Sequence, residues 1–253
     1  MSADAADAPR FHSLIPRRAV DRTLDADEVL EGWRESGGDS LRVALNMIAS
    51  VDGRIAVNGR SAPLGGPADR ALFHALRARA DAVMVAAGTV RAERYGPIIR
   101  DRARREWRVG QGLPEQPLAV IVSRSLELDP ALPLLADPDT RAVILTPSSG
   151  DLPPSAASVD YIRTPTLRAA LSELRARWGV RLIVCEGGPT LNAALAADSL
   201  IDEVFLAISP LLVGDTADGV LLHGDAPPEP QALELRMLLQ YENQLYAHYV
   251  SRS

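Results

Sequence analysis

Short aliphatic runs alternate along this chain with segments of helical period. Residues 82–87, 118–123 and 182–185 are apolar at nearly every position. Such runs are typical of strands that are buried on both faces of a parallel sheet. Between them, one apolar helical face is indicated by residues spaced i, i+3, i+4, i+7 and i+11, namely Leu167, Ala170, Leu171, Leu174 and Trp178. The alternation predicts an α/β fold with right-handed crossovers between its strands.

The two ends of the chain depart from this alternation. Residues 1–22 are rich in Ala, Asp, Arg and Pro and lack an apolar period, so they predict a flexible N-terminal arm. At the other end, apolar runs at 232–240 and 245–250 flank a polar turn and predict an antiparallel hairpin, which makes the sheet mixed. Because the composition does not change between these ends, residues 23–253 are predicted to form a single domain.

One charged segment predicts a mobile surface loop. Residues 100–115 combine charged side chains with Gly110, Gly112 and Pro114 and show no sustained period. Segments of this composition usually run over the surface and move more than the elements they connect.

Composition and charge exclude several classes of function. The net charge is −6, whereas a nucleic-acid-binding surface needs concentrated positive charge, so no nucleic-acid partner is expected. No apolar run approaches the roughly 18 residues that cross a bilayer, so no membrane partner is expected and the protein is predicted to be cytoplasmic. The single cysteine, Cys185, excludes an internal disulfide and a multi-cysteine zinc site, and no metal site is predicted. Its apolar neighbours place it in the core.

Two strand-to-helix junctions carry glycine and form the candidate cofactor site. Gly88 follows the run 82–87, and Gly187-Gly188 follows the run 182–185. In an open α/β sheet such junctions lie at the carboxyl ends of strands, where helix N-termini attract phosphate and glycine allows a close approach. Neither junction reads G-x-G-x-x-G and no phosphate-loop lysine is present, so Rossmann and P-loop sites are not favoured. A simple tight turn is the alternative at each junction.

Four segments, in this order, resemble those of a known family. They are Asn46 to Ala56 (N-M-I-A-S-V-D-G-R-I-A), Arg70 to Val90, Glu186 to Leu191 (E-G-G-P-T-L) and Ile201 to Gly214. Over residues 41 to 250 the chain resembles the reductase domain of the bifunctional riboflavin-biosynthesis deaminase/reductase, a pyrimidine reductase of the dihydrofolate-reductase-like superfamily. The resemblance implies a three-layer α/β fold with a mixed, mostly parallel sheet, NADPH as the cofactor, and a homodimer.

The same resemblance assigns the cofactor contacts. The dinucleotide would be held by Gly88, Thr89, Gly187, Gly188, Pro189 and Thr190. Ser123 and Arg124 would meet its adenosine end, where a hydroxyl and a guanidinium suit a 2′-phosphate and so favour NADPH over NADH. An exposed loop charge is the alternative for Arg124.

Two acids are candidates for the catalytic proton. Glu186 occupies the position of the glutamate that the family uses near the reacting carbon, and a carboxyl group between a buried strand and the nicotinamide is suited to donate a proton. A local ion pair is the alternative for Glu186. Asp52 lies in a Ser-x-Asp-Gly turn, and turn chemistry is its alternative.

The substrate side departs from the family pattern. The family carries a lysine where this chain has Asn46, a threonine where it has Gly66, and Asp-Asp-Pro where it has Glu93-Arg94-Tyr95. Asn46, Ser50 and Gly66 are the candidate substrate-binding residues, and the partner is a small-molecule heterocycle. The sequence thus predicts an NADPH-dependent pyrimidine reductase that acts on 5-amino-6-(5-phosphoribosylamino)uracil or a related heterocycle. Reduction of dihydrofolate, and NADPH binding without this turnover, are the alternatives.

Overall fold

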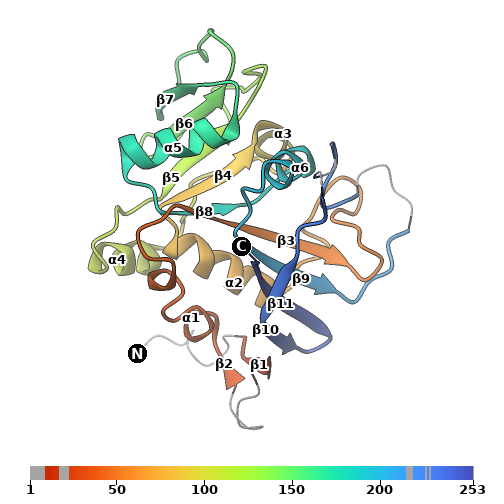
Figure 1. The fold of residues 1–253 in the computed structure, drawn as a ribbon. Helices are drawn as coiled ribbons and strands as arrows, with labels where there is room; N and C mark the ends of the chain where they lie inside the picture. The colour runs from red at the N-terminus through yellow and green to blue at the C-terminus, as the bar shows by residue number, and fades with distance from the viewer. Residues whose placement is uncertain (1–8, 17–22, 215–218, 226, 228, 253) are drawn as a thin grey trace.

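One mixed sheet runs through the computed structural model, which describes residues 9–16, 23–214, 219–225, 227 and 229–252 (Figure 1). Its eleven strands follow the order β2-β1-β10-β11-β9-β3-β8-β4-β5-β6-β7. The strands from β9 to β7 are parallel to one another: β3 (Arg42–Ser50), β4 (Ala82–Ala86), β5 (Leu118–Val122), β6 (Arg141–Thr146), β7 (Ser158–Arg163), β8 (Leu182–Cys185) and β9 (Glu203–Ser209). The antiparallel edge consists of β1 (Phe11–Ile15), β2 (Thr23–Leu24), β10 (Leu233–Tyr241) and β11 (Gln244–Ser251).

Helices cover both faces of this sheet, because its strands carry apolar side chains on each side. The α2 face is covered by α1 (Ala26–Val29) and α2 (Pro67–Arg79), which pack against alternate strand residues such as Ala44, Val83 and Val184. The α6 face is covered by α5 (Leu167–Trp178) and α6 (Pro189–Ala197), which pack against the residues between, including Cys185. Burial raises the pKa of the Cys185 thiol to about 12. The predicted three-layer α/β fold and the core position of Cys185 are confirmed.

The remaining helices are short. They are α3 (Ala87–Ala92), α4 (Arg102–Gly110) and a 3₁₀ turn at Glu35–Gly37. In the part of the chain that the structure describes, no helix is both long enough and apolar enough to span a membrane.

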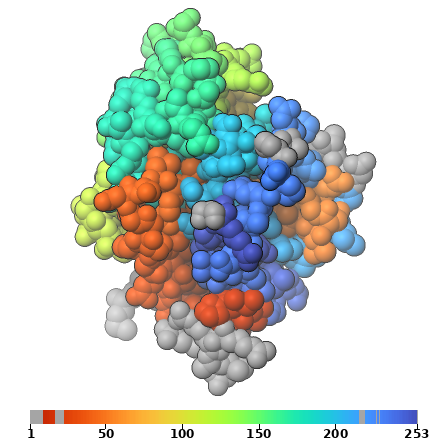
Figure 2. Space-filling model, in the orientation of Figure 1, coloured from red at the N-terminus to blue at the C-terminus, as the bar shows by residue number. Residues whose placement is uncertain are grey.

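Part of the predicted N-terminal arm is a strand of the sheet. β1 pairs with β10, and Phe11 is fully buried against the rings of Tyr241 and Tyr246. The prediction of a flexible arm is therefore wrong for residues 11–15, because one aromatic side chain and the backbone ladder fix this short segment. In Figure 2 the red N-terminal atoms lie against the blue C-terminal hairpin. Residues 1–8 and 17–22 of the predicted arm lie outside the described residues.

The segment that was predicted to be a mobile loop contains helix α4. This helix begins at Asp101, whose carboxylate accepts hydrogen bonds from the backbone N–H groups two and three residues further on. Its anchor is Arg108, which is fully buried and donates to the carbonyl oxygens of Ala78 and Ala80 at 2.9 and 2.7 Å. These carbonyls lie at the end of α2, where the helix itself supplies no donors. The loop prediction is wrong because α4 is held in place by a buried arginine and not by an apolar face. The apolar spacing that identifies a helix in a sequence is therefore missing here.

Replacing Arg108 by methionine should lower the free energy of unfolding by about 3 kcal/mol, because buried carbonyl oxygens lose their donors. Its Nε atom also donates to the carbonyl of Pro114 at 2.8 Å, so that segment loses an anchor as well. Urea denaturation of the variant and the parent measures the difference. Arg102→Met is the matched control: this side chain is 84% exposed, and the change should stay below about 0.5 kcal/mol. Equal losses in the two variants would contradict the anchoring role of Arg108.

Candidate functional site

The two glycine-bearing turns meet at the carboxyl edge of the sheet. Because β4 and β8 are neighbouring parallel strands, the turns that follow them, Gly88-Thr89 and Gly187-Gly188, lie side by side. The backbone N–H of Ala86 donates to the carbonyl of Gly187 at 2.7 Å. A Cβ added at Gly188 would lie 2.8 Å from Oγ1 of Thr89, so any side chain at 188 would displace that hydroxyl. The structure thus brings together four of the residues that were predicted to hold the cofactor.

The turn after β8 has the features of a cradle for a dinucleotide. Gly187 has a φ of +81°, a conformation that residues with a Cβ rarely adopt. α6 begins directly after Gly188, so the unpaired N–H groups of its first turn, including that of Thr190, lie at the same edge. Asn192 is buried beside Gly187, and its Oδ1 atom has no hydrogen-bond partner among the described residues. A glycine backbone with positive φ, beside an unsatisfied buried acceptor and a helix N-terminus, fits the polar groups of a dinucleotide.

The predicted adenosine end lies one strand further along the same edge. β5 pairs with β4 on the side away from β8, and Ser123 and Arg124 follow it. Ser123 is buried, and its Oγ accepts a hydrogen bond from the backbone N–H of Leu126 at 3.0 Å. Arg124 is exposed, and its guanidinium forms no hydrogen bond or ion pair with a described residue. This guanidinium is therefore available to a ligand at the edge that holds the glycine turns.

Glu186 follows β8 directly and is held inside the protein by two side chains. Its carboxylate accepts hydrogen bonds from Nε and Nη2 of Arg77, both at 2.7 Å, in a bidentate ion pair. The hydroxyl of Tyr95 donates to Oε2 of Glu186, also at 2.7 Å. The side chains of Arg77 and Glu186 are 9% and 3% exposed. The ion pair that was the alternative to a catalytic role for Glu186 is thus present. A role of Glu186 in the reaction stays a prediction.

Arg77 and Tyr95 are contacts of the candidate residue Glu186 that the sequence did not reveal. Burial alone would lower the pKa of Arg77, but the neighbouring Glu186 carboxylate reverses this effect and raises it. Burial, together with the negative charge of Glu186, raises the pKa of Tyr95 well above its ordinary value. At neutral pH a guanidinium cation and a neutral phenol therefore face Glu186. Arg77 and Tyr95 are 109 and 91 residues from Glu186 along the chain, so no motif spacing could have paired them.

Asp52 joins the loop after β3 to the loop after β9. Its carboxylate accepts hydrogen bonds from the hydroxyl of Ser50 and from the backbone N–H groups of Val213 and Gly214. These bonds lower the pKa of Asp52 to about 2, so the group is ionised at neutral pH and carries no proton. Oγ of Ser50 also accepts from the backbone N–H of Arg54 at 2.9 Å. This geometry fits the turn role that the sequence left open for Asp52.

Three consecutive residues in the middle of the sheet are only half-buried. Asn46, Met47 and Ile48 lie on β3, which has the parallel neighbours β8 and β9. A strand in this position is normally covered on both faces. Because successive side chains of a strand point to opposite faces, three half-buried residues in a row show that neither face is fully covered here. The side chain of Asn46 forms no hydrogen bond with a described residue.

Gly66, the third candidate substrate-binding residue, is the residue before the first turn of α2. It faces the C-terminal hairpin, where an added Cβ would lie 3.1 Å from Oε1 of Gln244.

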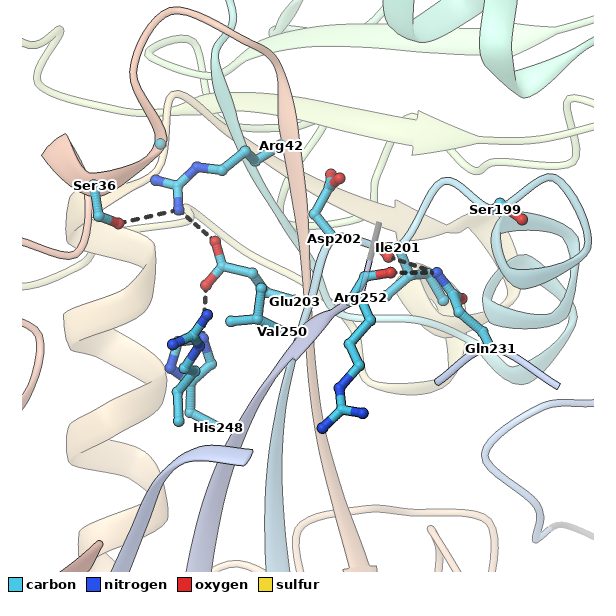
Figure 3. A pocket seen from close by; sticks show the side chains of 13 residues that line it. Ser36, Arg42, Ser199, Ile201, Asp202, Glu203, Gln231, His248, Val250 and Arg252 are labelled. Carbon is cyan, nitrogen blue, oxygen red and sulfur yellow. Dashed lines mark hydrogen bonds and ion pairs between the residues drawn. The ribbon is translucent and has the colours of Figure 1, made fainter. Parts of the chain in front are cut away.

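A separate cavity opens at the opposite, amino-terminal edge of the parallel strands (Figure 3). It has a volume of about 760 Å³ and is lined by the starts of β3 and β9 and the end of β11. Its central group is Glu203, which is bound by Arg42 and His248 and accepts a hydrogen bond from Nε1 of Trp33 at 2.7 Å. Because these groups satisfy one another and lie at the other end of the strands, this cavity is not part of the candidate cofactor site.

The fold and the paired glycine turns define a class: an α/β protein with a dinucleotide-type cradle at the carboxyl edge of its sheet. More particularly, the chain belongs to the RibD C-terminal domain family, whose model matches residues 41–246. The expected family and reductase class are confirmed.

Known relatives include a pyrimidinone 5′-phosphate reductase and riboflavin biosynthesis proteins. The 2,5-diamino-6-ribosylamino-4(3H)-pyrimidinone 5′-phosphate reductase of Methanothermobacter thermautotrophicus is 28% identical over 208 residues, which are 79% of this chain and 92% of that protein. The riboflavin biosynthesis protein RibD of Mycobacterium tuberculosis is 30% identical over 182 residues, 70% of this chain but only 44% of that protein. The crystal structure of a pyrimidine reductase-like protein from Corynebacterium diphtheriae has a TM-score of 0.75 at 22% identity, covering 91% of this chain and 100% of that one. These relatives favour a pyrimidine reductase over the two alternatives.

Proposed function

We propose that this protein is an NADPH-dependent reductase that acts on a ribosylamino-pyrimidine 5′-phosphate of riboflavin synthesis. The observation that carries the proposal is the junction after β8, where the anchored Glu186 precedes the turn that meets Gly88-Thr89. The archaeal relative supports the substrate class, since its name specifies such a phosphate. The half-buried middle of β3 is compatible with it, because side chains there stay partly accessible at the centre of the sheet.

The chemistry of this substrate class defines what the site has to do. A ribosylamino group opens to an imine, and reduction adds a hydride to the imine carbon and a proton to its nitrogen, which gives a ribitylamino group. When bound, NADPH supplies the hydride. The protein's own residues hold the substrate in place, exclude water, and deliver the proton or stabilise positive charge on the nitrogen.

Glu186 is the catalytic residue in this proposal. Its carboxylate, which accepts hydrogen bonds on both oxygens, lies next to the reacting carbon and stabilises the positive charge of the protonated imine. Arg77 and Tyr95 are positioning residues, since their three hydrogen bonds fix the orientation of Glu186.

Asp52, Ser50, Asn46 and Gly66 take part in binding rather than in proton transfer. Asp52 and Ser50 fix the loops that flank the substrate edge, because the ionised carboxylate binds the loop after β9. Asn46 offers its free amide to the substrate from the α2 face, and Gly66 lets the side chain of Gln244 pack at the start of α2. The homodimer remains part of the proposal on the family resemblance alone.

NADPH oxidation by the purified protein tests the proposed function. The substrates are the 5′-phosphates of the ribosylamino derivatives of 2,5-diamino-4(3H)-pyrimidinone and of 5-aminouracil. We expect turnover of at least one of them, with the ribitylamino product identified by mass spectrometry. NADPH binding without oxidation in the presence of either substrate would overturn the proposal.

NADPH should bind at least tenfold more tightly than NADH, because the exposed guanidinium of Arg124 can pair with the 2′-phosphate. A charge-assisted hydrogen bond of this kind is worth about 2 kcal/mol. Fluorescence titration with the two cofactors measures the ratio. Arg124→Ala should reduce the preference, whereas Arg102→Ala, on the exposed side of α4, should leave it unchanged. Equal dissociation constants for NADPH and NADH in the parent protein would refute this expectation.

A further inference from the structure

Helix α2 carries a second carboxyl group toward the face of the sheet on which Glu186 lies. Asp69, Phe73 and Arg77 follow one another at intervals of four residues, so they lie along one side of the helix. Arg77 binds Glu186, and its guanidinium carbon lies 4.0 Å from the ring centroid of Phe73. This row therefore points to the sheet, with Asp69 about 12 Å along the helix from Arg77.

Asp69 lies beside the C-terminal hairpin, on the same side of the sheet as the half-buried part of β3. The hydroxyl of Tyr246 on β11 lies close to both the backbone and the carboxylate of Asp69. Tyr246 pairs across the sheet with Ala207 of β9, and Ala207 pairs with Ile48 of β3. Residues paired across neighbouring strands share a face, so Asp69 lies on the same side of the sheet as Ile48 and the hydrogen-bond-free Asn46.

The Asp69 carboxylate has no ion-pair partner in the part of the chain that the structure describes. It is half-buried, and its Oδ2 atom lies 2.8 Å from the position that a Cβ would take at Gly65, so glycine at 65 makes room for it. Burial raises the pKa of Asp69 to about 6, and the positive charge of Arg70 opposes this shift. The hairpin brings the titratable groups Tyr246, Tyr241 and Glu242 to this place, and Arg77, Glu186 and Tyr95 lie further along the same side of α2. A half-buried carboxylate whose oxygens no side chain engages is suited to a ligand with N–H donors.

We infer that Asp69 contacts the heterocycle of the substrate and selects a 2-amino-4(3H)-pyrimidinone over a uracil. The inference rests on the proposed function, which leaves open which of these two rings is reduced. The aminopyrimidinone presents its N3–H and its 2-amino N–H side by side, and a carboxylate accepts both with its two oxygens. A uracil has a carbonyl at position 2, and its oxygen would face a carboxylate oxygen with no proton between them.

Steady-state kinetics with NADPH and the two ribosylamino 5′-phosphates tests this inference. In the parent protein, kcat/KM should be at least about tenfold higher for the 2-aminopyrimidinone. Asp69→Asn should reverse this order, because an amide offers one acceptor to N3–H and one donor to the neighbouring carbonyl of the uracil. Glu242→Gln is the matched control, since it removes a negative charge from the exposed hairpin turn, and it should leave the ratio unchanged.

The pH dependence gives a second readout of the same residue. In the parent protein, kcat/KM for the 2-aminopyrimidinone should fall as the pH is lowered through about 6, because protonation removes an acceptor from Asp69. This acidic limb should be absent in Asp69→Asn. Equal kcat/KM values for the two substrates, or a ratio that Asp69→Asn does not change, would overturn the inference and leave the proposed function standing. Turnover of neither substrate would overturn both.

Discussion

Replacing Glu186 by glutamine should lower kcat by a factor on the order of 10² to 10⁴, while NADPH affinity changes by less than about fivefold. Glutamine keeps the shape of the side chain and an oxygen that can still accept a hydrogen bond from Arg77 or Tyr95. It carries no charge, so it cannot stabilise the positive charge of the protonated imine. Single-turnover NADPH oxidation and an equilibrium titration of NADPH measure the two quantities separately.

A matched variant separates the chemistry of Glu186 from its anchoring. Tyr95→Phe removes one hydrogen bond to Glu186 but leaves the carboxylate and its pair with Arg77, so its kcat should fall by less than about tenfold. If Glu186→Gln turns over at the parent rate on a verified substrate, Glu186 is structural. If its NADPH affinity falls as much as its kcat, the residue acts on cofactor binding instead.

Replacing Arg77 by methionine should lower the free energy of unfolding by about 3–5 kcal/mol, because it leaves the buried Glu186 carboxylate without its counter-charge. The same change removes a donor from the carbonyl of Ile98, which accepts a hydrogen bond from Nη1 of Arg77 at 2.8 Å. Urea denaturation monitored by circular dichroism measures the loss.

The double variant Arg77→Met, Glu186→Met supplies the control for this prediction. It should recover most of the lost stability, because an apolar pair of similar volume often replaces a buried ion pair without net cost. It should not recover activity, since Glu186 is absent. Losses in the double variant that equal the sum of the two single losses would show that the two side chains are not coupled.

Elements with a strong local pattern could be predicted from the sequence. Helix α5 has its apolar period, a Thr166 side chain that caps its start, and Gly179 in the left-handed conformation at its end. The aliphatic runs became parallel strands, and Gly88 and Gly187-Gly188 met as expected because neighbouring parallel strands end at one edge. In each case the signal lies within about fifteen residues of the element that it predicts.

Contacts made by long polar side chains could not be predicted in this way. Arg77 binds Glu186 across 109 residues, and Arg108 caps a helix that ends about 30 residues earlier. Composition assigns arginines to the surface, yet both are buried, because each satisfies groups that would otherwise be buried without a partner. The sequence does not single out Asp69 for a related reason. An acid in the first turn of a helix is common, and only the packing of the hairpin against α2 shows that this carboxylate is partly removed from water.

The position of β3 between β8 and β9 bears on how the chain is made. β3 leaves the ribosome about 130 residues before β8, and during that interval neither of its edges has its native neighbour. At roughly 5–20 residues per second, the interval lasts on the order of ten seconds. An unpaired apolar strand is a template for other chains, so fragments that end before residue 182 should aggregate. The central sheet can close only once synthesis has passed the end of β9 at Ser209.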